Sequence, residues 1–290
     1  MVGVRLPDLL LDEVEGLKQG ERVRLIRGQV AFRAGRYAEA VEAFRAALEA
    51  QPDSVRARVN LGAALAKTGD REGAVAELRA ALDRDADNFT AHLNLGNLLI
   101  EDGAYAEAAE QLAAAVDLEP DDGGAHRLLA DALRRGGRPA EAIPHYAAAA
   151  RLAPQDESTR VEGAATLVDL GRYPEARRVL EAAQAALPAS GLVAQALARL
   201  LAGCPDLTVR DGERALDLAQ RVYAVSPTPF HAETLAMALA QVGRCEEAAE
   251  LQRQVVDAAG QKGDGDRGSS RAEILAVYEQ GPPCAVPSSP

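Results

Sequence analysis

Residues 28–52, GQVAFRAGRYAEAVEAFRAALEAQP, decide the fold of this chain. Two apolar segments of helical period lie on either side of a turn at Gly35-Arg36-Tyr37, and Pro52 follows the second segment. A glycine just past a helix supplies the left-handed residue that ends it, and a proline lacks the N–H that a continuing helix needs. The stretch therefore predicts one helix-turn-helix unit.

The same frame returns every 34 residues, which predicts seven units over residues 21–262. Its eighth place is always small and holds Gly28, Gly62, Gly96, Ala130, Ala164, Ala198 and Ala236. Alanine also fills the twentieth place and, in the first five units, the twenty-seventh, whereas the twenty-fourth is mostly large. Small residues let two helices approach closely, and large ones fill the seams between them. Because one pair cannot bury its apolar face alone, the pairs must stack.

Several segments depart from the repeat. Residues 1–20 contain an amphipathic pattern that predicts an N-terminal helix or cap, and residues 203–210 form an insertion in the sixth unit. Residues 263–270 are rich in Gly and Ser and read as a flexible linker. A C-terminal capping helix is predicted over 271–280, followed by a disordered tail over 281–290. Asp53, Asp87, Asp121 and Asp156 are the expected N-caps of successive units.

These motifs together resemble the tetratricopeptide repeat family: the small eighth place, the Gly-x-Tyr turn, the alanines, the large twenty-fourth place and the closing proline. The resemblance covers residues 21–262. It implies an all-α fold, a right-handed α-solenoid of stacked helix-turn-helix repeats. It also implies that the first helix of each pair lines a concave face, that the second lines the convex face, and that the protein binds other proteins.

Composition excludes several classes of partner and compartment. The formal charge of −12 disfavours nucleic acid and anionic membranes. The three cysteines, Cys204, Cys245 and Cys284, are odd in number and lack metal-ligand spacing, so they favour a reducing, cytoplasmic location. No apolar run reaches the roughly 18 residues that a membrane span needs, and the first residues do not read as a signal peptide.

No catalytic motif occurs, and the chain is predicted to be non-enzymatic, with no cofactor and no metal. His92 and His126 share one place in neighbouring units, which raises the idea of a metal pair. No carboxylate or cysteine stands at ligand spacing beside them, so packed histidines are the expected outcome.

Charge and amides mark the first helices of the first four units. These helices carry ten basic side chains against four acidic ones in an acidic protein, and a concave basic strip attracts anions. Asn60, Asn94 and Asn97 form a short row whose amides suit a peptide backbone. The predicted ligand is an extended or helical, acidic peptide segment held in the groove. The candidate site residues are Arg33, Asn60, Lys67, Asn94, Asn97, Arg127 and Arg134.

Two other interpretations stay open. The asparagine row is similar to the ladder in the repeats of O-linked N-acetylglucosamine transferase, which would make the chain a substrate-recruiting subunit of a separate enzyme such as a glycosyltransferase. The exposed end faces of a repeat array would alternatively support structural self-association.

Overall fold

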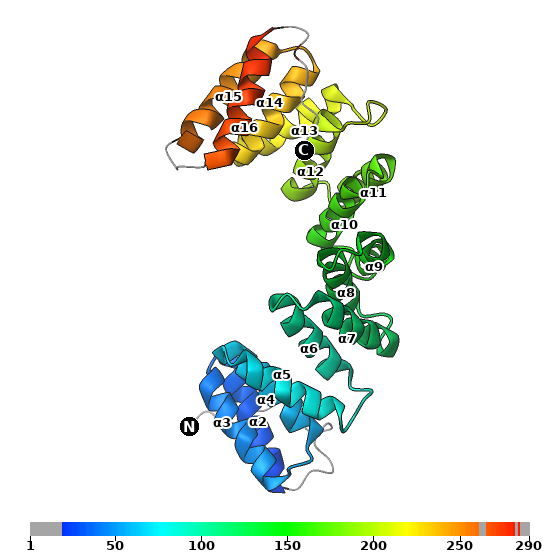
Figure 1. Cartoon of the computed structure of the whole chain (residues 1–290), viewed down its shortest axis with the longest axis vertical. Helices are drawn as coiled ribbons and strands as arrows, with labels where there is room; N and C mark the ends of the chain where they lie inside the picture. The colour runs from blue at the N-terminus through cyan, green and yellow to red at the C-terminus, as the bar shows by residue number, and fades with distance from the viewer. Residues whose placement is uncertain (1–18, 261–264, 282–283, 285–290) are drawn as a thin grey trace. The chain divides into compact units, whose positions relative to one another are not determined.

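The computed structural model describes residues 19–260, 265–281 and 284 (Figure 1). In these residues there are fifteen helices and no strand. The chain divides into two compact units, Met1–Gly137 and Arg138–Pro290. The predicted N-terminal helix over residues 1–20 lies almost entirely outside the described residues, because the description begins at Gln19.

The described part of the first unit consists of seven helices. They are α2 (Gln19–Arg33), α3 (Tyr37–Ala50), α4 (Val55–Thr68), α5 (Arg71–Leu82), α6 (Phe89–Glu101), α7 (Tyr105–Leu118) and α8 (Gly123–Arg135). Each helix packs against the next one along the chain, and the first helices α2, α4, α6 and α8 also contact one another in sequence. The predicted site residues therefore lie on neighbouring helices.

The second unit repeats this pattern. Its helices are α9 (Pro139–Leu152), α10 (Glu157–Asp169), α11 (Tyr173–Ala186), α12 (Gly191–Gly203), α13 (Gly212–Val225), α14 (Pro229–Gln241), α15 (Cys245–Gly260) and α16 (Gly265–Glu279). Consecutive helices again pack together, as do α10 with α12 and α12 with α14. Stacked helix pairs are the arrangement of an all-α repeat solenoid, and the predicted fold class is confirmed.

Close approach at the eighth place explains why it must be small. A Cβ atom added to Gly62 would lie 2.7 Å from Cγ of Leu78, and one added to Gly96 would lie 2.5 Å from Cγ of Leu112. Both leucines are completely buried. The large residue at the twenty-fourth place therefore fills the space that the missing side chain leaves.

Helix ends follow the expected chemistry with one correction. The turn glycines have left-handed backbone, for example Gly35 with φ of 73°. The N-caps of α4, α6 and α8 are Ser54, Asn88 and Asp122, one residue later than predicted, and only Asp156 was placed correctly. All four caps accept a hydrogen bond from the backbone N–H three residues on. In the first three, this bond fixes the cap one residue later than predicted.

The insertion of the sixth unit is held by hydrogen bonds. Arg177 donates to the carbonyl of Val209 at 3.0 Å, and Arg210 donates to the carbonyl of Cys204 at 2.6 Å. Val209 and Cys204 are buried, whereas Leu207 is exposed. Asp211 then caps α13 by accepting from the backbone N–H of Arg214.

The C-terminal predictions need correction. The segment expected as a flexible linker over 263–270 is helical from Gly265, so the capping helix begins six residues before 271 and ends at Glu279. Gly and Ser have low intrinsic helix propensity, but packing of α16 on α15 overrides it. Tyr278 of α16 is only 1% exposed, and Gln252 of α15 donates to the carbonyl of Arg271 at 3.1 Å.

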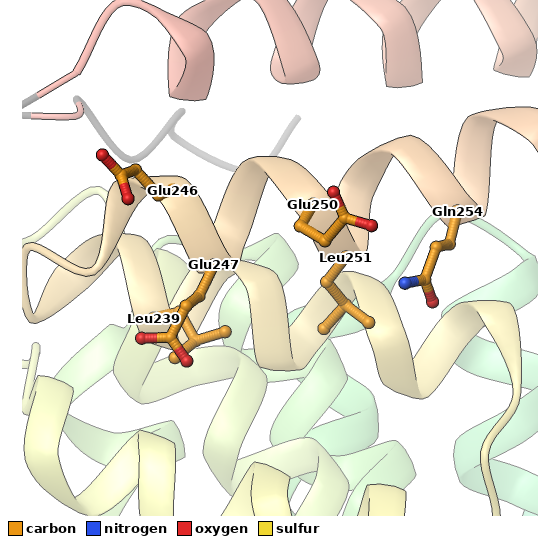
Figure 2. A pocket seen from close by; sticks show the side chains of 6 residues that line it. All are labelled: Leu239, Glu246, Glu247, Glu250, Leu251 and Gln254. Atoms are coloured by element: carbon orange, nitrogen blue, oxygen red, sulfur yellow. The ribbon is translucent and has the colours of Figure 1, made fainter.

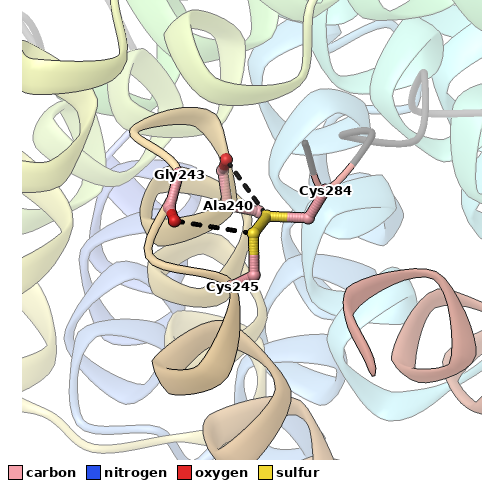
Figure 3. Close-up of a disulfide and its surroundings, with 4 residues drawn as sticks. All are labelled: Ala240, Gly243, Cys245 and Cys284. Atoms are coloured by element: carbon pink, nitrogen blue, oxygen red, sulfur yellow. Dashed lines mark hydrogen bonds between the residues drawn. A yellow bond between two sulfur atoms is a disulfide. The ribbon is translucent and has the colours of Figure 1, made fainter. Parts of the chain in front are cut away.

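Two of the three cysteines are not free thiols. Figure 3 shows a disulfide between Cys245, at the start of α15, and Cys284, beyond the end of α16. Cys284 is buried, so the tail predicted to be disordered over 281–290 is fixed at that residue. Residues 282–283 and 285–290 lie outside the described residues. Only Cys204 remains a free thiol, and it is buried.

Candidate functional site

A cavity of about 200 Å³ lies on the first-helix side of the first unit. It is lined by side chains of α2, α3 and α4, namely Gln29, Phe32, Arg33, Phe44, Asn60 and Ala63. Phe44 is 1% exposed and belongs to the core. The cavity brings together two of the seven predicted site residues, Arg33 and Asn60.

Two polar side chains of this cavity lack protein partners among the described residues. Nδ2 of Asn60 is buried and has no hydrogen-bond partner there, which costs about 1–3 kcal/mol in a protein interior. Arg33 is exposed, and no described carboxylate pairs with it. Nδ2 donates two hydrogen bonds, and a guanidinium binds carboxylates with its planar fork. Apolar Phe32 and Phe44 complete the lining, so the cavity fits an oxygen-bearing group on an apolar stem.

The other five predicted residues do not line the cavity. Lys67 is exposed in the last turn of α4, and Asn94 is half-buried on α6. Asn97 donates to Glu101 at 3.5 Å on its own helix, and Arg127 pairs with Asp131 at 3.5 Å. The fifth, half-buried in the last turn of α8, is Arg134.

The basic strip is narrower than the sequence count indicated. Arg58 is only 17% exposed in its side chain and binds Glu77 of α5 at 2.8 Å. Arg27 lies 3.6 Å from Glu39 of α3. Each of these arginines thus pairs with a carboxylate on the second helix of its own pair. Part of the positive charge counted on the first helices is therefore neutralised by the second helices.

The fourth place of the frame, four residues before the small eighth place, has a structural role that the sequence analysis missed. In four units its side chain is bonded to the backbone carbonyl six residues earlier, at Arg58, His92, His126 and Arg160. The second ring nitrogen of His92 lies 2.9 Å from Oε1 of Gln111. Both nitrogens of His92 are thus engaged within the protein. Across the described part of the chain, no three His, Cys, Asp or Glu residues are grouped for a metal.

A cavity of about 400 Å³ lies along α14 and α15 in the second unit. Figure 2 shows its lining, Leu239, Glu246, Glu247, Glu250, Leu251 and Gln254. Glu247 accepts hydrogen bonds from Arg244, which lower the pKa of that carboxyl. Glu250 pairs with Arg253 at 2.8 Å. Two of its three carboxylates thus have partners already, so this cavity is a weaker candidate than the one beside Asn60.

No helix in the described ranges has both the length and the apolar character required to cross a bilayer.

Comparison with known proteins identifies the repeat. A family model described as tetratricopeptide repeat matches residues 26–89, 64–117 and 93–157, and a second model of the same description matches residues 133–200. No curated protein was matched at the sequence level.

Three solved structures illustrate the likeness in fold. PilF of Pseudomonas aeruginosa has a TM-score of 0.60 at 22% identity, covering 75% of this chain and 97% of that one. A tetratricopeptide repeat protein of Parabacteroides merdae has a TM-score of 0.59 at 17% identity, covering 90% and 100%. YrrB, described as a TPR protein with an unusual peptide-binding site, has a TM-score of 0.56 at 23% identity, covering 69% and 97%. At these identities the likeness concerns the fold.

Proposed function

Because this chain belongs to the tetratricopeptide-repeat family, we propose that it is a non-enzymatic scaffold whose first unit binds an acidic peptide segment of a partner protein. The observation that carries the proposal is the cavity beside Asn60. It combines a buried amide with an arginine, and neither the amide nitrogen nor the guanidinium is paired with another described residue.

The contacts of the cavity define what the peptide must offer. In this proposal Asn60 donates to a backbone or side-chain oxygen, and Arg33 donates to a carboxylate. Phe32 adds apolar surface to the same cavity. Lys67 and Asn94, on the same series of first helices, would extend the contact beyond the cavity, with Arg134 as a further cation. The description of YrrB as a peptide-binding protein supports a peptide as the class of ligand.

A charge reversal at Arg33 tests the proposal. Arg33→Glu should weaken binding to acidic 12-residue peptides on an array by roughly tenfold or more, because a charged hydrogen bond contributes about 1.5–3 kcal/mol. The matched control is Arg45→Glu, which makes the same charge change at an exposed position on α3. Equal binding by the two variants would contradict the assignment of this cavity.

A double variant tests the wider strip. Reversal of Lys67 and Arg134 to Glu should reduce binding of long acidic peptides more than that of short ones, since these residues lie outside the cavity. Circular dichroism melting checks that the repeats stay folded.

The expected cytoplasmic location loses its main support. It rested on unpaired cysteines, whereas Cys245 and Cys284 form a disulfide. Disulfides persist mainly in oxidising compartments, so we propose such a compartment for the oxidised chain.

Recruitment for a separate enzyme and self-association through end faces remain predictions. One residue of the asparagine row, Asn97, already donates to Glu101.

A further inference from the structure

A second cluster of polar and aromatic groups lies on the first helices of the second unit. Phe230, the second residue of α14, is 51% exposed. The guanidinium carbon of Arg199 on α12 lies 5.5 Å from the centre of its ring. A cation over an aromatic face is attracted by the ring quadrupole, which holds the guanidinium in place. This leaves a large apolar face beside a positioned positive charge.

A buried amide fixes the two helices at this point. Gln195, four residues before Arg199 on α12, is 4% exposed and donates to Oγ1 of Thr234 at 2.7 Å. Thr234 is fully buried, and its hydroxyl donates to the carbonyl of Phe230 at 3.3 Å. The turn that carries Phe230 is thereby tied to the helix that carries Arg199, so the pair is preorganised.

The cluster lacks hydrogen-bond acceptors and donors that it needs. Nη1 of Arg199 is buried without a hydrogen-bond partner among the described residues, and so is Oε1 of Gln195. No carboxylate in the described ranges pairs with Arg199. Several other arginines of this unit have carboxylate partners, for instance Arg214, which binds Glu181 at 2.6 Å. A half-buried guanidinium without an acceptor has lost water without gaining a counterion, which favours an external anion.

The charge of α12 and α14, the two helices that carry the site, favours an anion with a single charge. Arg199 is the only ionised side chain of α12, and the only one of α14 is Glu233. Glu233 is occupied by an ion pair with Arg271 of α16. One guanidinium balances one carboxylate, whereas a phosphate dianion would be left partly uncompensated.

We infer that Arg199 and Phe230 form a second peptide-binding site, which takes a carboxylate next to an apolar side chain. Arg199 binds the carboxylate through its planar fork, and the exposed face of Phe230 contacts the apolar side chain. The site uses residues of the second unit only. It therefore stands independently of the cavity beside Asn60.

The test records the NMR signals of the Phe230 ring in the full chain carrying Arg33→Glu, in which the cavity beside Asn60 is impaired. The protein contains four phenylalanines, so ring-selective isotope labelling gives few NMR signals, and Phe230→Leu assigns the relevant one. Acetyl-Glu-Leu-amide should shift the Phe230 signals saturably. Its neutral isostere acetyl-Gln-Leu-amide should bind at least tenfold more weakly. Acetyl-leucine, with a terminal carboxylate, tells whether the site takes a side-chain or a terminal carboxylate.

Variants establish the role of the guanidinium. Arg199→Gln should abolish the response to the glutamyl probe, and Arg199→Lys should weaken it. The matched control Arg221→Gln, at an exposed arginine of α13 paired with Asp217, should leave it unchanged. An unaltered response in Arg199→Gln, equal binding of the two isosteres, or preferential binding of inorganic phosphate would overturn the inference. The isostere comparison decides the matter if Arg199→Gln fails to fold.

Discussion

The disulfide between Cys245 and Cys284 should be the strongest single constraint on the C-terminal end of the second unit. The two cysteines are 39 residues apart in sequence, and the chain between them contains α15 and α16. Closing a loop of that length removes conformational entropy from the unfolded chain worth about 4 kcal/mol at 25 °C. Replacing both cysteines by serine should therefore lower the free energy of unfolding of the second unit by up to about 4 kcal/mol.

The noncovalent contacts of α16 should survive this change in part. Tyr278 stays in an apolar environment, and Arg253 still pairs with Glu279 at 2.9 Å. We therefore expect α16 to open locally more often, while α10 to α13 keep their protection. Hydrogen exchange followed by mass spectrometry separates the two regions, since faster exchange should be confined to α14 to α16.

Urea unfolding provides the quantitative assay. The wild-type chain in dithiothreitol should unfold like the double serine variant without reductant, and dithiothreitol should not affect the variant. Burial raises the pKa of the remaining thiol, Cys204, which should react with Ellman's reagent only after unfolding. If reductant leaves both the unfolding midpoint of the wild-type chain and the exchange of α16 unchanged, the disulfide does not stabilise this end.

Other predictions concern the packing of single residues. Burial raises the pKa of Tyr278, whose hydroxyl has no hydrogen-bond partner among the described residues. Wild-type stability should therefore fall as the pH rises above about 10, where only the unfolded chain loses this proton. Tyr278→Phe should remove that loss and keep or raise stability at pH 7, as urea midpoints at both pH values would reveal. Gly62→Ala should destabilise by about 1–2 kcal/mol despite the higher helix propensity of alanine, because its Cβ meets Leu78. Gly191→Ala should be neutral or stabilising in the same urea unfolding measurements, since its added Cβ meets nothing within 4 Å.

The sequence predicted the repeat because the physical constraint is itself periodic. The eighth place must be small where the twenty-fourth is large, as Gly62 and Leu78 show, and this pairing recurs in other repeats. The N-cap residue of each helix was harder to predict. Asp53 and Ser54 can both cap a helix, and only the backbone geometry selects Ser54. The disulfide could not be predicted, because three distant cysteines do not indicate which two of them meet.

The face that a side chain occupies was harder to predict than its helix. Counting charges on the first helices treated all arginines alike, yet Arg58 and Arg160, at the fourth place of the frame, bind backbone carbonyls six residues earlier. Arg33, at the thirteenth place, and Arg199, at the ninth, have no carboxylate partner in the described structure. The place in the frame therefore separates arginines that hold the repeats together from those left for a ligand. In both candidate sites the arginine is beside a buried amide with an unsatisfied polar atom, Asn60 in one and Gln195 in the other. A guanidinium without a carboxylate and an amide with an unsatisfied atom, both judged among the described residues, make each site more favourable for an oxygen-bearing ligand than net charge alone would.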